Sequence, residues 1–357
     1  MRLKDNAGQY MQKYSIFFVL LVMILISSFL NPNFFGVNNL TNIGRQLAVA
    51  TILAYGEMLL IICGQLDLSV GAVLALSGVL SVNFYKTTGS LLGAFLLAIA
   101  VAVACNLVNA FFVANCRMPA FIVTLAMTMA ARGLALLYTK GQNILQLGDY
   151  KVFGQGWMTD IPFLSKLTFL SGIPISIVLL ILITVIVWYV LNHTRLGRSL
   201  YAIGGNEEAA IASGINVVRS KYVAFIINGV LVGIAGVLFM SRVNAGLPNG
   251  AVGYEMEGLT AAIVGGTSFS GGVGTTSGTL VGSFIIGILN NIMNLTGVDS
   301  YVQQVVKGAI IVAAVLYDLK FKNKKSIKVI LGDNKKVAAA EAAGNAAEAE
   351  GGSSEDK

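Results

Sequence analysis

The sequence contains little charge. Asp, Glu, Lys and Arg together make up 11% of its 357 residues, and hydrophobic residues make up 56%. Soluble domains carry roughly 25% charged residues. The composition therefore excludes a soluble globular protein and points to a chain that lies mostly in a membrane.

The sequence also lacks the usual groups of an enzyme. It has one histidine, His193, and three cysteines without metal-ligand or CxxC spacing. No G-x-x-x-x-G-K-[ST] phosphate loop, HExxH pattern or nucleophile elbow occurs. We therefore expect no catalytic residue, no metal site and no ATP hydrolysis by this chain, and we assign the cysteines to packing.

Long apolar runs dominate what is present. A helix needs about 20 residues to cross a hydrocarbon core of about 30 Å, and about ten runs approach that length. The predicted fold is an all-α polytopic membrane protein with broken or re-entrant segments. The expected spans are 14–30, 47–63, 70–85, 91–114, 119–139, 173–191, 222–240, 259–270, 275–295 and 302–319. The eighth is too short and glycine-rich for a full crossing, which favours a re-entrant segment buried in protein.

Basic residues orient the spans. If the chain crosses ten times, most lysines and arginines fall on the side of residues 1–13, of the 192–221 loop and of residues 320–357, which predicts that both termini are cytoplasmic. Lys140, Lys151 and Lys166 would lie on the opposite side. The organisation is then a cytoplasmic N-terminus (1–13), a transmembrane domain (14–319), and a basic juxtamembrane segment with a disordered tail (320–357). The net charge of +7 reflects this topology, not nucleic-acid binding. The lysines of the juxtamembrane segment are expected to be attracted to anionic membrane lipid.

The 192–221 loop contains signals for a short helix. Asn206 suits the N-cap, Glu207 and Glu208 suit the positive N-terminal end, and Gly214 suits a left-handed residue after the last turn. The result would be a helix of under two turns.

Polar residues within the apolar runs are the candidates for a solute path, because such groups are costly at membrane depth and usually face the protein interior. Glu57 lies in the second run. Gln65, Asp67 and Ser69 lie in GQLDLSVG (64–71), which reads either as a capping break or as a point of solute contact. A similar pattern in GGTSFSGG (265–272) hints at an internal repeat.

Amides and one arginine complete the candidate set. Asn106 and Asn109 share a helix face, as do Asn290 and Asn294. Such amides either bind solute hydroxyls or hold helices together. Arg132 is a candidate for the path or for an ion pair with Glu57.

Four blocks of sequence resemble one family. Glu208 to Gly214, EAAIASG, matches the E-A-A-x-x-x-G signature of membrane subunits of ATP-binding-cassette (ABC) importers. With its flanks (TRLGRSLYAIGGNEEAAIASGI), and with GQLDLSVG, AAIVGGTSFSGGVGT and VVKGAIIVAAVLYD, it resembles the permeases of ribose-type monosaccharide importers, the inner-membrane components of binding-protein-dependent transport systems. The resemblance covers about residues 14–322.

The resemblance implies a coupling helix that docks on an ATPase. The coupling residues would be Asn206, Glu207, Glu208, Ala209, Ala210, Ile211 and Gly214. It also implies a separate ATPase subunit that carries ATP and Mg, an extracytoplasmic solute-binding protein, a second permease chain of the same or a related kind, and a place in the bacterial cytoplasmic membrane. This chain itself would bind no cofactor.

The resemblance leaves the solute open. The family pattern reads G-G-I-D-L-S where this chain has Gln65 in place of the second glycine. A ribose-, galactose- or xylose-like monosaccharide is the first expectation. Nucleosides or other polyhydroxylated solutes are alternatives, and so is an autonomous carrier with Glu57, Asp67 and Arg132 as ion-coupling groups.

Overall fold

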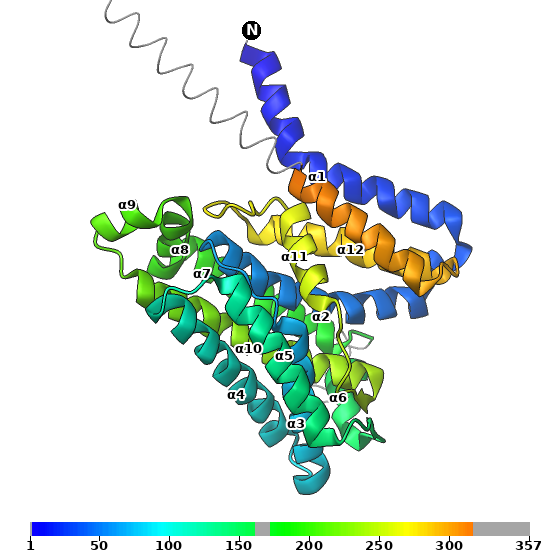
Figure 1. Ribbon diagram of the computed structural model, residues 1–357. Coiled ribbons are helices and arrows are strands. Elements are labelled where there is room, and N and C mark those ends of the chain that lie inside the picture. Colours follow the sequence, from blue (N-terminus) through cyan, green and yellow to red (C-terminus); the bar gives the residue numbers. More distant parts are fainter. Residues whose placement is uncertain (1, 161–171, 317–357) are drawn as a thin grey trace, which may run out of the picture. The chain divides into compact units, whose positions relative to one another are not determined.

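A computed structural model describes residues 2–160 and 172–316 and gives side-chain environments from residue 16 onward. Besides an apolar helix at Ser300–Leu316, twelve numbered α-helices account for most of this part (Figure 1). They are α1 (Arg2–Leu30), α2 (Val37–Ile62), α3 (Val70–Thr88), α4 (Leu91–Ala110), α5 (Ala120–Thr139), α6 (Val152–Gln155), α7 (Ile175–His193), α8 (Arg195–Gly205), α9 (Glu207–Ala212), α10 (Val217–Val243), α11 (Tyr254–Val264) and α12 (Thr276–Leu295).

Short elements connect these helices. A π-helical turn, η2 (Phe111–Asn115), continues α4, and three 3₁₀ turns are η1 (Pro32–Phe35), η3 (Gly148–Lys151) and η4 (Met158–Asp160). Strands β1 (Ile144–Leu145) and β2 (Ala245–Gly246) form an antiparallel pair in which Ile144 lies opposite Gly246. The fold is otherwise helical, as the apolar runs predicted.

Within the described residues, seven helices are long and apolar enough to cross a membrane, and Ile16–Leu30 and Ser300–Leu316 are shorter apolar helices. The polytopic all-α prediction is confirmed. The eighth expected span, 259–270, differs from the structure, because the helix there is α11 at residues 254–264. Its 11 residues extend about 16 Å, which is roughly half of a hydrocarbon core and agrees with a broken segment.

Contacts divide the chain into a unit of residues 1–308 and a second of residues 309–357, and the packing below concerns the first. The basic segment and tail expected from residue 320 onward lie outside the described residues, as does Lys166.

Helix α10 packs against α2, α3 and α4. Two of its glycines let the α4 backbone approach closely: a Cβ atom at Gly229 would lie 2.8 Å from Val103 Cα, and one at Gly233 would lie 2.6 Å from Ile99 Cα. Helix α2 is buried on nearly every side from Leu47 to Ile62, as expected of a helix that is apolar all round. These four helices enclose the buried polar groups described below.

Helices α11 and α12 pack against each other and against α2, and α1 contacts α12. A hydrophobic cluster of Phe34, Ile43, Leu47 and Ile288 joins the start of α2 to α12. The loop between α11 and α12 extends toward α8 (yellow in Figure 1).

Candidate functional site

The α8–α9 loop has the local structure that the sequence predicted. Asn206 Oδ1 accepts a hydrogen bond from the Ala209 N–H at 2.9 Å, and Gly214 adopts a left-handed φ of 79°. Helix α9 has six residues and ends as the Ile215 N–H donates to the Ala210 carbonyl at 3.0 Å. Thr194 caps α8 in the same manner, accepting from the Gly197 N–H at 3.2 Å, so the sequence predicted one helix where the loop has two.

The outer face of α9 is open. Glu208, Ala209 and Ile211 are exposed, with 55% of Ile211 accessible, whereas Ala210 is buried. Glu208 and Ile211 are therefore both accessible on this face.

Glu207 makes an ion pair within the chain. Its carboxylate accepts two hydrogen bonds from Lys221 Nζ, at 2.9 and 3.0 Å. The ion pair ties α9 to the first turns of α10, and 46% of the Glu207 side chain remains exposed. Glu208 keeps its exposed position.

A second polar cluster lies between α2, α3, α4 and α10. Asn228 Nδ2 donates to Asp67 Oδ2 at 2.7 Å and to Asn106 Oδ1 at 3.0 Å. Asp67 Oδ1 accepts from the Ser69 N–H at 2.8 Å, and Asn109 Nδ2 donates to Ser69 Oγ at 3.2 Å. All five side chains are fully buried. The amides therefore hold helices together, which is one of the two roles that their spacing allowed.

The loop that carries Asp67 is also held by α5. Thr124 Oγ1 accepts from the Leu68 N–H at 3.1 Å, and Thr128 Oγ1 donates to the Leu68 carbonyl at 2.8 Å. Gln65, in the same loop, is partly exposed. Asp67 accepts from the N–H of Ser69, the N-cap residue of α3, and within the described part of the chain the structure shows no side-chain capping bond to the first turn of this helix.

Glu57 is fully buried, and in the described part of the chain neither of its carboxylate oxygens has a hydrogen-bond partner. It faces α11, where a Cβ atom at Gly258 would lie 3.4 Å from Glu57 Cγ. The charged groups that act on it, Asp67 and Glu255, are also acidic. An ionised carboxylate in such a place is strongly unfavourable.

Arg132 does not pair with Glu57, which corrects the expected ion pair. Its Nη1 donates to the carbonyls of Pro248 and Gly250, both at 2.8 Å, in the segment between α10 and α11. The nearest carboxylate acting on it is that of Glu255. Arg132 therefore connects α5 to the start of α11.

Asn290 and Asn294 lie at separate contacts. Glu257 Oε1 accepts hydrogen bonds from Asn290 Nδ2 at 3.2 Å and from Lys307 Nζ at 2.5 Å. Asn294 Oδ1 accepts from Gln303 Nε2 at 2.9 Å. Asn290 Oδ1 is buried without a partner among the described residues. The shared helix face is confirmed, but each amide has its own partner.

Several residues of these sites were not singled out from the sequence: Asn228, Lys221, Glu257 and Lys307. Asn228 and Lys307 interrupt apolar runs, and this signal was available. Their partners lie 161 and 50 positions away in the chain, so no spacing rule could identify them.

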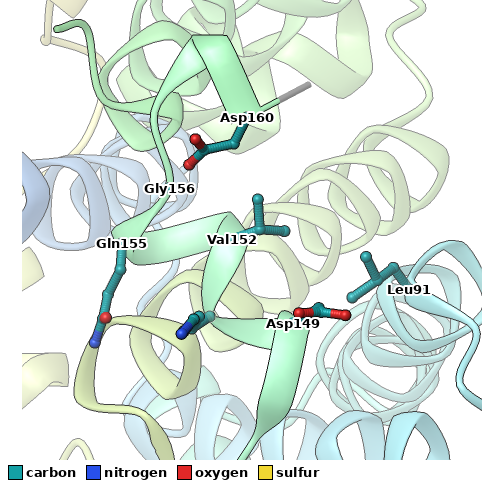
Figure 2. Close-up of a pocket in the computed structure, with 7 residues that line it drawn as sticks. Leu91, Asp149, Val152, Gln155, Gly156 and Asp160 are labelled. Carbon is teal, nitrogen blue, oxygen red and sulfur yellow. The ribbon is translucent and has the colours of Figure 1, made fainter. Parts of the chain in front are cut away.

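A surface hollow of about 440 Å³ lies near the start of α4 (Figure 2). Its lining residues are Leu91, Asp149, Lys151, Val152, Gln155, Gly156 and Asp160. None of the residues predicted for the solute path contributes to it.

Membrane-spanning helices, amides buried between them and a loop helix with an open face together define a polytopic membrane permease. The chain belongs to the family described as branched-chain amino acid transport system / permease component, whose profile matches residues 39–315. No solved structure matches the chain.

Curated relatives cover nearly the whole length. The chain is 40% identical over 302 residues to the ribose import permease protein RbsC of Escherichia coli K12, covering 84% of this chain and 92% of the relative. It is 40% identical over 313 residues to RbsC of Bacillus subtilis 168, covering 87% and 94%. It is 34% identical over 315 residues to the D-allose transport system permease protein AlsC of E. coli K12, covering 88% and 93%.

Proposed function

We propose that this chain is the transmembrane permease subunit of an ABC importer that carries a monosaccharide, with ribose as the first candidate. The names of the relatives support the solute class, because they specify ribose and allose. The observation that carries the coupling to a motor is α9, a capped helix with an exposed face on a polytopic permease.

The proposed partners follow from this role. A separate ATPase subunit would bind ATP and Mg and receive α9, with Ile211 as an apolar anchor and Glu208 opposite a basic residue. The importer would also need an extracytoplasmic solute-binding protein and a second permease chain, and it would lie in the bacterial cytoplasmic membrane with both termini in the cytoplasm. Closure of the ATPases would move the loop as a rigid body.

The solute path is also a proposal. Glu57, Asp67, Ser69, Asn106 and Asn109 are fully buried, so a path along them would open only after the helices move apart. Gln65, Arg132, Asn290 and Asn294 complete the proposed set. Because Ser69, Asn109, Arg132, Asn290 and Asn294 already make hydrogen bonds within the described structure, we propose that the set binds solute weakly and in passing, and that the binding protein supplies the affinity.

Reconstitution in liposomes tests the function. The chain is combined with its ATPase and its ribose-loaded binding protein, and uptake of labelled ribose is followed with and without ATP on the ATPase side. We expect uptake only when all three proteins and ATP are present. Uptake by the chain alone, driven by a proton or sodium gradient, would show an autonomous carrier and overturn the proposal.

Substitutions at the exposed face test the coupling assignment. Glu208→Lys and Gly214→Leu should each lower co-purification of the ATPase and ATP-dependent uptake, because one reverses a charge and the other strains a residue with φ of 79°. Glu255→Gln lies far from α9 in the sequence and serves as a control for co-purification. Unchanged co-purification of the ATPase with both variants would show that α9 does not bind the ATPase.

A further inference from the structure

Three backbone segments meet beside the loop that carries α9: the end of α2, the end of α8 and the loop between α11 and α12. The Gly272 N–H donates to the Ile62 carbonyl at 3.0 Å. A Cβ atom at Gly204 would overlap the Ile62 carbonyl and would lie 2.6 Å from Gly272 N. The backbones are therefore in direct contact, with no side chain between them.

The loop side of this contact is equally close. Gly271 and Gly272 have left-handed φ values of 82° and 73°. A Cβ atom at Gly271 would lie 2.8 Å from the Gly204 carbonyl oxygen. Glycine adopts these positive φ values without strain, and its lack of a Cβ atom leaves room for the Gly204 backbone.

Tyr201 adds a directed bond to the same contact. Its hydroxyl, on α8, donates to the Gly274 carbonyl at 2.7 Å. Burial raises the pKa of Tyr201, so the hydroxyl keeps its proton at neutral pH and remains a donor. We name Tyr201, Gly204, Gly271 and Gly272 the glycine junction.

Helices α2 and α11 end in the same way. Helix α2 ends as the Gln65 N–H donates to the Leu60 carbonyl at 2.8 Å, and α11 ends as the Thr267 N–H donates to the Ala262 carbonyl at 3.0 Å. In each case a glycine with positive φ follows the helix, Gly64 or Gly266, which is the Schellman arrangement. The segment after α2 leads into the long helix α3, and the segment after α11 leads into the long helix α12. The glycine junction therefore joins the end of α8 to the end of α2 and to the loop that follows α11.

The α9 end of the loop is also anchored. Glu207 on α9 pairs with Lys221 on α10 at 2.9 Å, and α8 and α9 are separated by Asn206 alone. A displacement of α9 must therefore move α8. Since close-packed backbone does not compress, a displaced α8 must in turn move Ile62 and Gly272.

We propose that the glycine junction transmits movement of the α8–α9 loop to α2 and α11, and that its four members are positioning residues of the transport cycle. This inference rests on the proposed function, because it requires a motor that moves α9. The junction consists of backbone contacts and one hydrogen bond. An added methyl group or loss of that hydrogen bond would change its geometry and leave the surface that binds the ATPase unaltered.

Two neighbouring glycines provide a matched test. Gly204→Ala inserts a methyl group into the junction, whereas a Cβ atom at Gly205 would meet nothing within 4 Å. Both glycines lie in the last turn of α8 with negative φ, so the gain in helix propensity is the same for the two variants. The two variants are compared in the reconstituted complex of permease, ATPase and ribose-loaded binding protein.

We expect both variants to reach the membrane and to retain the ATPase. Gly205→Ala should keep the parental ratio of ribose imported to ATP hydrolysed. Gly204→Ala should lower that ratio by about tenfold, in the range of typical coupling free energies between sites. Tyr201→Phe, which removes one oxygen atom, should lower the ratio by a smaller factor with the same melting temperature.

Other results would overturn the inference. An equal ratio in Gly204→Ala and Gly205→Ala would show that the contact only fills space. Loss of the ATPase from Gly204→Ala would show that the junction shapes the docking surface instead. If Gly204→Ala does not reach the membrane, Tyr201→Phe decides, and a parental ratio in that variant overturns the proposal. Absence of ATP-dependent uptake in the parental complex would refute the proposed function instead.

Discussion

Asn228 links the buried polar cluster, and its removal has a calculable effect on stability. Its Nδ2 donates to Asp67 Oδ2 at 2.7 Å and to Asn106 Oδ1 at 3.0 Å, whereas its Oδ1 has no partner among the described residues. Asn228→Ala thus removes two bonds and strands two buried acceptors.

The two lost bonds differ in strength. A hydrogen bond to a charged group contributes about 1.5–3 kcal/mol, if Asp67 is ionised. An amide bond between membrane helices contributes about 0.6 kcal/mol. We therefore expect Asn228→Ala to lower the free energy of unfolding by about 2–4 kcal/mol, which is roughly a 30- to 700-fold change in the equilibrium constant.

Unfolding in mixed micelles with increasing denaturing detergent measures this loss. Asn83→Ala is the matched control, because Asn83 is partly exposed and its Nδ2 donates to the Tyr138 hydroxyl, where water or lipid head groups can replace the bond. A change within about 0.5 kcal/mol is expected there. If Asn228→Ala also changes stability by less than about 0.5 kcal/mol, the cluster contributes little to holding the helices together and the reasoning is refuted.

Substitutions at Glu57, Asn206 and Arg132 have expected effects that can be measured one at a time. Glu57→Gln should leave the unfolding free energy unchanged or raise it by up to about 2 kcal/mol, since it removes an unpartnered buried carboxylate; a clear loss in the same detergent titration would reveal a positively charged partner. Asn206→Ala should destabilise α9 by about 1 kcal/mol through loss of its cap, seen as faster amide exchange at Ala209, whereas unaltered exchange there would contradict a capping role. Arg132→Met should release the two carbonyls that it binds between α10 and α11, with faster proteolysis of residues 244–253; the parental cleavage rate would show that other contacts hold this segment.

Some features of the site are set by residues close together in the chain. Asn206, Glu208 and Gly214 lie within nine positions, and capping and a left-handed terminus depend on backbone groups three or four residues away. The short helix was therefore predictable. The apolar runs were equally readable, because span length is set by the thickness of the membrane.

Contacts across the fold were not predictable in this way. Arg132 was expected to pair with Glu57 by charge alone, yet it binds two backbone carbonyls on another segment. Glu207 was predicted as a coupling residue, and only the fold shows that Lys221 lies within reach of its carboxylate. Charge complementarity names possible partners, and only the packing of helices determines which of them come within reach.

The sequence by itself thus determined the class of protein, the approximate spans and the capped helix α9, because hydrophobic length and local capping depend on neighbouring residues. The tertiary structure alone decided that Asn228 joins α10 to α4 and to the loop that carries Asp67, and that Gly204 touches Ile62 and Gly272. Glycine pairs are frequent in this chain of 40 glycines, and a glycine becomes a contact point only where another backbone approaches it.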